Sequence, residues 1–486
     1  MNVPEPLLRS LGSTGGDAGA LELLVVQQRR RRRLTLRALL DAVAEAPPTA
    51  VPPAAAARVL ADWRLLTAAE RADPAAARRV VDYPMTGAWA ERALRALLAP
   101  DPAQPPAAAL AHLGALAASA AARAGLRFTA TVPVRDGRLV LPTLGSCPAG
   151  PGRTEVHVSG DAGRLWLYVP GAGHPEARPA GPAAPAGPAA PAAFADTAAG
   201  HDTPHPGTGR PLEVRRGPDG IWRSAAAAWR PIRALWGRDG RPVLLDDTDP
   251  YRDEERSSNP YGMSAAGRLD PGQHARWRTA WQEAQPWLRL GGGGRALETD
   301  TLLDCLVPLA GSPTAHSSAT RGEAFGALLS SVPRSGLELA GTLVHELQHT
   351  KLLALTALTV LHTADDEPRY WAPWRPDPRP FDGLFQGAYA HLALADFHQR
   401  VALSPGAPPA VRDAAWADHC RCRQQVEAAL PQLLGSSRLT AQGRTLAAAM
   451  SVHHMRLKEH APPDGHLARA TAYVETARVI WRRQSV

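Results

Sequence analysis

The segment spanning residues 335–362 constrains the fold more than any other part of this chain. It contains no proline, although the whole sequence has 47 prolines, and it is rich in leucine, alanine and threonine. An uninterrupted run of this length and composition predicts one long helix. Within that helix lies the sequence His345-Glu346-Leu347-Gln348-His349. The C-terminal half is therefore expected to be built around a helix that carries two histidines four residues apart.

Residues four apart share one helix face, with Cβ atoms about 5–6 Å apart, so His345 and His349 can direct ring nitrogens to one metal ion. In a zinc hydrolase with this motif, the glutamate takes a proton from metal-bound water, which makes Glu346 a candidate catalytic residue. The alternative is a chance spacing of two histidines. The flanking residues are apolar, however, and a histidine without a partner is costly in a buried helix. The pattern favours a catalytic metal site.

A catalytic metal usually takes a third protein ligand. The metzincin pattern would need glycine at position 352 and histidine at position 355, and both positions hold leucine. The acids at 365–367 lie in a polar turn that ends in proline. The preferred third ligand is His391, in an apolar segment predicted to be helical, and His398 is the second choice. Taken alone, His391 would be interpreted as a core histidine.

Between these two segments, residues 370–380 are too rich in proline to form a helix and predict a rigid loop. The loop carries Arg375 and Arg379, and either guanidinium group could bind a carboxylate. Pairing of these arginines with Asp377 or Asp382 at the surface is an equally good interpretation.

The composition along the chain predicts an α+β fold that is predominantly helical. Residues 1–125 are expected to form a helical N-terminal region, and short runs within 126–178 predict a small β segment. Residues 179–206 are almost wholly proline, alanine and glycine, which indicates a linker. Residues 207–486 are expected to form the helical metal-binding catalytic domain, with a few strands. In the N-terminal region, the arginines at 29–33 favour a solvated helix face over a phosphate contact.

Composition also limits the compartment and the partners. The net charge of +8 is spread along the chain, so nucleic acid is not an expected partner. Four scattered cysteines do not form a disulfide framework and favour a reducing, cytoplasmic location. Because the sequence contains no apolar run of about 18 residues, no membrane association is expected.

Several of these motifs together resemble one family, the HExxH-type 2-oxoglutarate-dependent peptide beta-hydroxylases of actinobacterial ribosomal-peptide pathways. The similar stretches are residues 343–349, 372–375, 377–380, 383–384 and 386–391, preceded by 317–321 and 325–326. The resemblance covers roughly residues 210–400. It implies a precursor peptide as substrate, with a radical-SAM maturase as a further candidate partner.

The same resemblance implies that Fe(II), 2-oxoglutarate and dioxygen hydroxylate a β-carbon of a peptide side chain. His345, His349 and His391 would hold the iron, and Arg375 or Arg379 would bind the far carboxylate of the oxoacid. The usual triad of such oxygenases has two histidines and one carboxylate, so three histidines depart from it. The role of Glu346 is then open.

Two other functions are compatible with the residues. A zinc metallopeptidase would use the same helix, with Glu346 as general base, because imidazole suits both metals. The chain lacks a recognised third-ligand pattern of a protease, and a hydrolase has no need of the arginine-bearing loop. The third function is a non-enzymatic peptide-maturation scaffold in which a metal is structural or absent.

Overall fold

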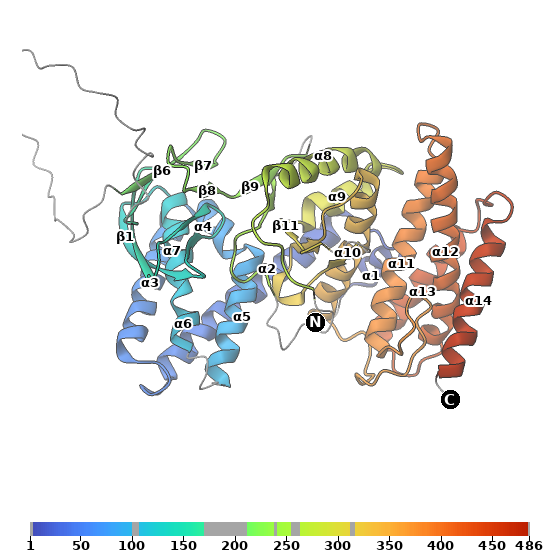
Figure 1. Ribbon diagram of the computed structural model, residues 1–486. Coiled ribbons are helices and arrows are strands. Elements are labelled where there is room, and N and C mark those ends of the chain that lie inside the picture. The colour runs from blue at the N-terminus through green and yellow to red at the C-terminus, as the bar shows by residue number, and fades with distance from the viewer. Residues whose placement is uncertain are drawn as a thin grey trace, which may run out of the picture. The chain divides into compact units, whose positions relative to one another are not determined.

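The structure is a computed structural model that describes residues 3–99, 106–169, 211–237, 241–253, 263–311 and 316–484. It is mixed α+β and predominantly helical, as the sequence predicted (Figure 1). The chain divides into two compact units. The first comprises Met1–Ala46, Asp82–Asp101 and Arg233–Val486, and the second comprises Pro47–Val81 and Pro102–Ile232. The expected linker at 179–206 lies outside the described residues, and the four-part division of the chain stays a prediction.

The second unit combines a group of helices with an eight-stranded antiparallel sheet of order β7-β6-β5-β4-β1-β2-β3-β8. Helix α7 is rich in alanine and buried along its whole length, which allows it to lie close to strand β1. A Cβ at Gly114 of α7 would come within 2.8 Å of the Thr131 carbonyl oxygen. The four strands expected between residues 126 and 178 are confirmed as β1, β2, β4 and β5, and β3 was not predicted. The helices are α3 (Pro53–Ala72), α4 (Pro74–Val81), α6 (Pro106–Leu110) and α7 (His112–Arg123). The strands are β1 (Phe128–Arg135), β2 (Arg138–Leu141), β3 (Gly145–Pro148), β4 (Glu155–Asp161), β5 (Arg164–Leu167), β6 (Leu212–Arg216), β7 (Trp222–Arg223) and β8 (Arg230–Pro231).

The first unit packs long helices around a small sheet of order β12-β13-β11-β10-β9. Strands β10, β11 and β13 run parallel, and the two edge strands are antiparallel to their neighbours. Every residue of β11 and β13 is buried, as expected for the centre of a covered sheet. The strands are β9 (Arg233–Leu235), β10 (Val243–Leu245), β11 (Cys305–Pro308), β12 (Ser318–Ala319) and β13 (Ala327–Ser330), with a 3-10 turn η2 (Gly322–Ala324). The helices are α1 (Glu5–Gly12), α2 (Ala18–Glu45), α5 (Pro84–Leu98), α8 (Pro271–Leu288), α9 (Gly294–Leu302), α10 (Gly336–Thr356), α11 (Phe381–Ala402), α12 (Pro409–Leu434), α13 (Ala441–Arg456) and α14 (His466–Gln484).

Helix α10 is the long helix predicted from the proline-free segment. It begins after Ser335, whose hydroxyl accepts a hydrogen bond from the backbone N–H of Glu338 at 3.2 Å. It ends at Thr356, six residues before the predicted end. The reason is tertiary: the backbone of His362 pairs with Leu439 in an isolated bridge, and the Thr440 N–H donates to the Leu361 carbonyl.

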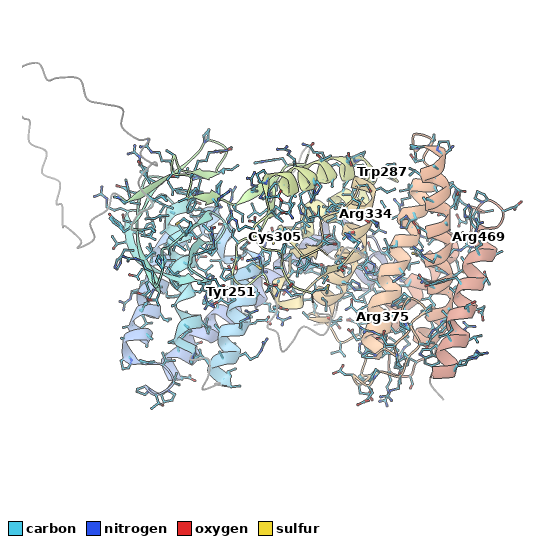
Figure 2. The ribbon with its side chains drawn as sticks, in the orientation of Figure 1. Tyr251, Trp287, Cys305, Arg334, Arg375 and Arg469 are labelled. Atoms are coloured by element: carbon cyan, nitrogen blue, oxygen red, sulfur yellow. The ribbon has the colours of Figure 1, made fainter. Side chains whose placement is uncertain are left out.

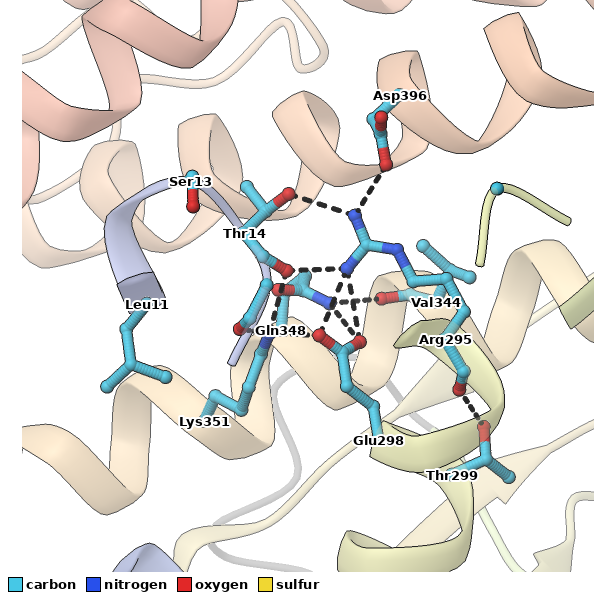
Figure 3. A network of polar contacts seen from close by, with 12 residues as sticks. Leu11, Ser13, Thr14, Arg295, Glu298, Thr299, Val344, Gln348, Lys351 and Asp396 are labelled. Atoms are coloured by element: carbon cyan, nitrogen blue, oxygen red, sulfur yellow. Dashed lines mark hydrogen bonds and ion pairs between the residues drawn. The ribbon is translucent and has the colours of Figure 1, made fainter. Parts of the chain in front are cut away.

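A buried network of charges ties α10 to its neighbours (Figure 3). Lys351 Nζ of α10 lies 2.7 Å from Glu298 Oε1 of α9, and Arg295 Nη2 lies 3.0 Å from Asp396 Oδ2 of α11. Lys351 Nζ and Arg295 also donate to the carbonyl oxygen of Thr14, in the loop after α1. The network therefore joins the N-terminal loop to three helices of the first unit.

The arginines at 29–33 lie on α2. Arg30, Arg31 and Arg33 are exposed, as predicted for a solvated helix face. Arg32 is different, because it is buried and its guanidinium donates to the backbone carbonyls of Asp82 and Phe325. Among the described residues, no helix combines the length and the apolar character that crossing a membrane requires.

Candidate metal centre

Three histidines of α10 and α11 are in ring contact. The ring centroids of His345 and His349 lie 4.8 Å apart, and those of His345 and His391 lie 5.6 Å apart. The two Nε2 atoms of the α10 pair are 3.2 Å apart. In the described part of the chain, no three His, Cys, Asp or Glu side chains are arranged so that they could hold one metal ion together. The three imidazoles instead meet edge to face.

Hydrogen bonds select the ring nitrogen that each histidine offers. His391 Nδ1 lies 2.9 Å from the Gly387 carbonyl oxygen, and His349 Nδ1 lies 3.2 Å from Gln386 Oε1. Because a carbonyl oxygen only accepts, both Nδ1 atoms carry a proton, and in the neutral form of each ring Nε2 keeps a lone pair. Such a hydrogen bond on the far side of the ring is typical of histidines that bind a metal through Nε2.

Two imidazoles of the centre, those of His345 and His391, are held in the neutral form. Burial lowers the pKa of His345 well below its usual value, and the neighbouring His349 and His391 add to the effect. Burial also lowers the pKa of His391 to about 4, against the opposing effect of its hydrogen bond to Gly387. Only a neutral imidazole binds a metal, so both rings are in the binding form at pH 7. The buried Nδ1 of His345 has no hydrogen-bond partner among the described residues.

Glu346 lies in the buried interior beside the histidines. Ser318 of β12 donates its hydroxyl to Glu346 Oε1 at 2.7 Å, and the Thr320 side chain also hydrogen-bonds to the carboxyl group. Burial raises the pKa of this carboxyl, whereas His349 and the two hydroxyl donors oppose the rise. A carboxylate held in this way can accept a proton or orient a neighbouring group.

The loop at 370–380 closes over His391. Its base is held by a pair of backbone hydrogen bonds, each 2.9 Å long, between Tyr370 and Arg379. The Trp374 ring stacks on the His391 ring, with centroids 4.5 Å apart and an interplanar angle of 18°. Gly387 makes room for this stacking, because a Cβ at that position would lie 2.2 Å from the Trp374 ring.

The two arginines of this loop share one carboxylate. Arg375 lies in the loop that leads into α11 (Figure 2). Its Nε lies 2.9 Å from Asp377 Oδ1. Arg379 Nη1 lies 3.6 Å from Asp377 Oδ2. Asp382, the other candidate partner, instead has Oδ1 3.4 Å from His362 Nε2. Both arginine side chains keep partial exposure, so an anionic ligand can reach them.

Of the two candidate third ligands, the structure brings His391 into contact with His345. The charged groups that act on His398 are Asp418 and Arg421 of α12, so His398 faces that helix. The sequence did not predict individual roles for Trp374, Gln386 and Ser318. Gly387, one helical turn before His391, was a signal for the close approach of a large side chain.

Comparison with protein-family models gives no match to this chain, and comparison with curated proteins gives none either. What the described residues define is a mixed α+β protein in which two packed helices, α10 and α11, bring the imidazoles of His345, His349 and His391 together. An aromatic ring covers the His391 imidazole, and the buried carboxyl group of Glu346 interacts electrostatically with His349.

Proposed function

We propose that this chain is an iron(II)- and 2-oxoglutarate-dependent enzyme that hydroxylates β-carbons of side chains in a ribosomally synthesised peptide. The observation that carries the proposal is the contact of the His345 ring with the rings of His349 and His391. In the neutral form of the latter two rings, Nε2 keeps its lone pair for a metal. The motif resemblance across residues 210–400 supplies the reaction type.

The donor set fits a metal of intermediate softness such as iron(II) or zinc, because all three donors are imidazole nitrogens. When bound, iron(II) with 2-oxoglutarate uses O2 to place one oxygen atom in a C–H bond of the peptide, while the oxoacid leaves as succinate and CO2. His345, His349 and His391 hold the ion in this proposal, and Gln386 and the Gly387 carbonyl orient two of the rings.

The loop at 370–380 supplies the other functions of the proposed site. Trp374 covers one face of His391 and keeps water from it. Arg375 or Arg379 binds the far carboxylate of the oxoacid. This carboxylate takes the place of Asp377 as the anionic partner of the arginine. The planar guanidinium suits this exchange because it can donate two parallel hydrogen bonds to either carboxylate.

A zinc metallopeptidase is the second candidate, and the placement of Glu346 favours it. The carboxyl group interacts electrostatically with His349, and burial raises its pKa, which suits a general base. In this alternative Glu346 accepts the proton of the attacking water, and Ser318 keeps the carboxylate in position.

Metal content tests the three ligands. We expect His345→Ala, His349→Ala and His391→Ala each to lose most of the iron that the full chain binds, as measured by plasma mass spectrometry after desalting. The matched control is His398→Ala, on the same helix as His391, which should retain the metal. If the His391→Ala variant binds as much metal as the unaltered chain, His391 is not a metal ligand.

The reaction type is tested with the full chain, loaded anaerobically with Fe(II) and 2-oxoglutarate and then exposed to air with candidate precursor peptides. We expect succinate and a peptide mass increase of one oxygen atom. Peptide cleavage in the absence of the oxoacid, abolished by Glu346→Gln, would establish the peptidase instead. If the chain binds no metal and converts neither 2-oxoglutarate nor the peptide, the non-enzymatic scaffold is the function that remains.

A further inference from the structure

A second feature of the first unit lies outside the histidine cluster. A cavity of about 240 Å³ opens between α2, the η2 turn and the C-terminal turns of α10. Gln28 and Arg31 of α2 line one side, and Arg321, Phe325, Thr350 and Leu353 are among the residues of the other side. None of the described residues that line the cavity is acidic, and two are arginines. The lining therefore has a net positive charge.

Arg321 is buried with unused hydrogen-bond donors. Its exposed fraction is 5%, and Nη2 donates to the Tyr251 carbonyl oxygen at 3.0 Å. Nε and Nη1 are buried and have no hydrogen-bond partner among the described residues. The carboxylate of Glu323 lies 3.6 Å from Nη1, which is an ion pair without a hydrogen bond. Burying unsatisfied donors of a charged group is expensive, so this guanidinium is a candidate for an anionic partner.

The other polar groups of the cavity extend the same chemistry toward solvent. Arg31 is about half exposed, and its Nη2 lies 3.3 Å from Glu91 Oε1, so it can attract an anion to the entrance. Gln28 is buried and adds an amide. Arg32, the next residue on α2, donates hydrogen bonds to the backbone carbonyls of Asp82 and Phe325. These N–H groups are therefore not available to an anion in the cavity.

We propose that this cavity binds a small oxyanion, the phosphate group or the carboxylate of a small metabolite, through Arg321 and Arg31. The volume agrees with a small ligand, because sites for drug-sized molecules have about 300–1,000 Å³. A planar guanidinium with free N–H groups recognises both kinds of oxyanion. The site is independent of the proposed hydroxylase function, because it shares no residue with the histidine cluster.

Isothermal titration calorimetry of the full chain with sodium phosphate, and separately with sodium succinate, tests the site at constant ionic strength. We expect one-to-one binding of at least one probe, and a loss of affinity of about tenfold or more in Arg321→Gln. Arg31→Gln should weaken binding less, by about threefold. The matched control is Arg30→Gln, an exposed arginine of the same helix that does not line the cavity, which should bind as the unaltered chain does.

The outcomes separate the possible sources of the anion. Binding of phosphate alone assigns a phosphate-bearing ligand, and binding of succinate alone assigns an organic acid. Absence of binding of both probes, or unchanged affinity in Arg321→Gln, would overturn the proposal. If Arg321→Gln does not fold, equal affinities of Arg31→Gln and Arg30→Gln would overturn it as well. The His345→Ala variant should bind the anion as the unaltered chain does. Loss of binding in this variant would mean that the anion binds at the histidine cluster and not in the cavity.

Discussion

The carboxylate of Glu298 compensates two buried cations. Lys351 Nζ lies 2.7 Å from Oε1, and Arg295 Nη1 lies 3.1 Å from Oε2. All three side chains are almost completely buried. The two cations lower the pKa of Glu298 against the effect of burial, so the group remains ionised and the charges remain paired. A buried ion pair of this kind adds little stability by itself, but removing one partner leaves a charge uncompensated.

Glu298→Ala is therefore expected to lower the free energy of unfolding by about 3–5 kcal/mol, measured by urea denaturation. The matched control is Glu427→Ala, which removes the partner of Lys458 from a more exposed pair with a separation of 2.8 Å. That change should cost less than about 1 kcal/mol. Equal effects of the two substitutions would mean that the buried network does not hold α9 and α10 together.

At the scale of elements, the position of the loop at 370–380 depends on the absence of a side chain at Gly387 of α11. The Trp374 ring occupies the space that a Cβ would take, and it stacks on His391. The loop also contacts the start of α11, where the rings of Tyr370 and Phe381 lie 5.3 Å apart. The fit at Gly387 therefore helps to place the loop that carries Arg375 and Arg379 against the helix of His391.

Gly387→Ala should displace Trp374, because the added methyl group would lie 2.2 Å from its ring. We expect a change in tryptophan fluorescence and a loss of about 1–3 kcal/mol in unfolding free energy, with unchanged helix content by circular dichroism. The control is Gly341→Ala in α10, where the nearest atom outside the helix, on Phe397, is 3.9 Å away. That variant should be as stable as the unaltered chain or slightly more stable. Identical fluorescence in both variants would show that Trp374 does not rest on Gly387.

At the scale of the whole molecule, buried neutral histidines make stability depend on pH. Burial lowers the pKa of His419 in the first unit to about 4 and that of His112 in the second unit to about 3. His419 donates from Nδ1 to the Ala395 carbonyl, and Arg423 and His398 lower its pKa further, whereas Asp396 raises it. In the unfolded chain, both groups titrate near pH 6.5.

The sign follows from proton uptake. Between about pH 6.5 and pH 4, the unfolded chain binds protons that the folded chain does not, so stability falls as the pH falls through this window. We expect each histidine to cost about 2 kcal/mol between pH 7 and pH 5, seen as a lower urea midpoint. In the His419→Gln variant, the loss of unfolding free energy between pH 7 and pH 5 should be smaller by about 2 kcal/mol. A variant with the same pH dependence as the unaltered chain would contradict the assignment.

The features that could be predicted from the sequence are the local ones. Helix α10 was predicted because the absence of proline and the composition rich in leucine, alanine and threonine act within a few residues of one another. The pairing of His345 with His349 follows from helix periodicity alone. The end of α10 was predicted six residues too late, because the backbone after Thr356 bonds to the segment at 438–440, which no local pattern indicates.

By itself, then, the amino-acid sequence determined the helix that presents two imidazoles on one face, four of the strands between residues 126 and 178, and the non-helical course of the loop at 370–380. Only the tertiary structure decided that His391 meets His345 while His398 turns toward α12. It also decided that Trp374 covers His391 and that the loop after α1 binds Lys351. The physical reason is that propensity and periodicity act between neighbours in the chain. Contacts between distant segments depend on how whole helices pack.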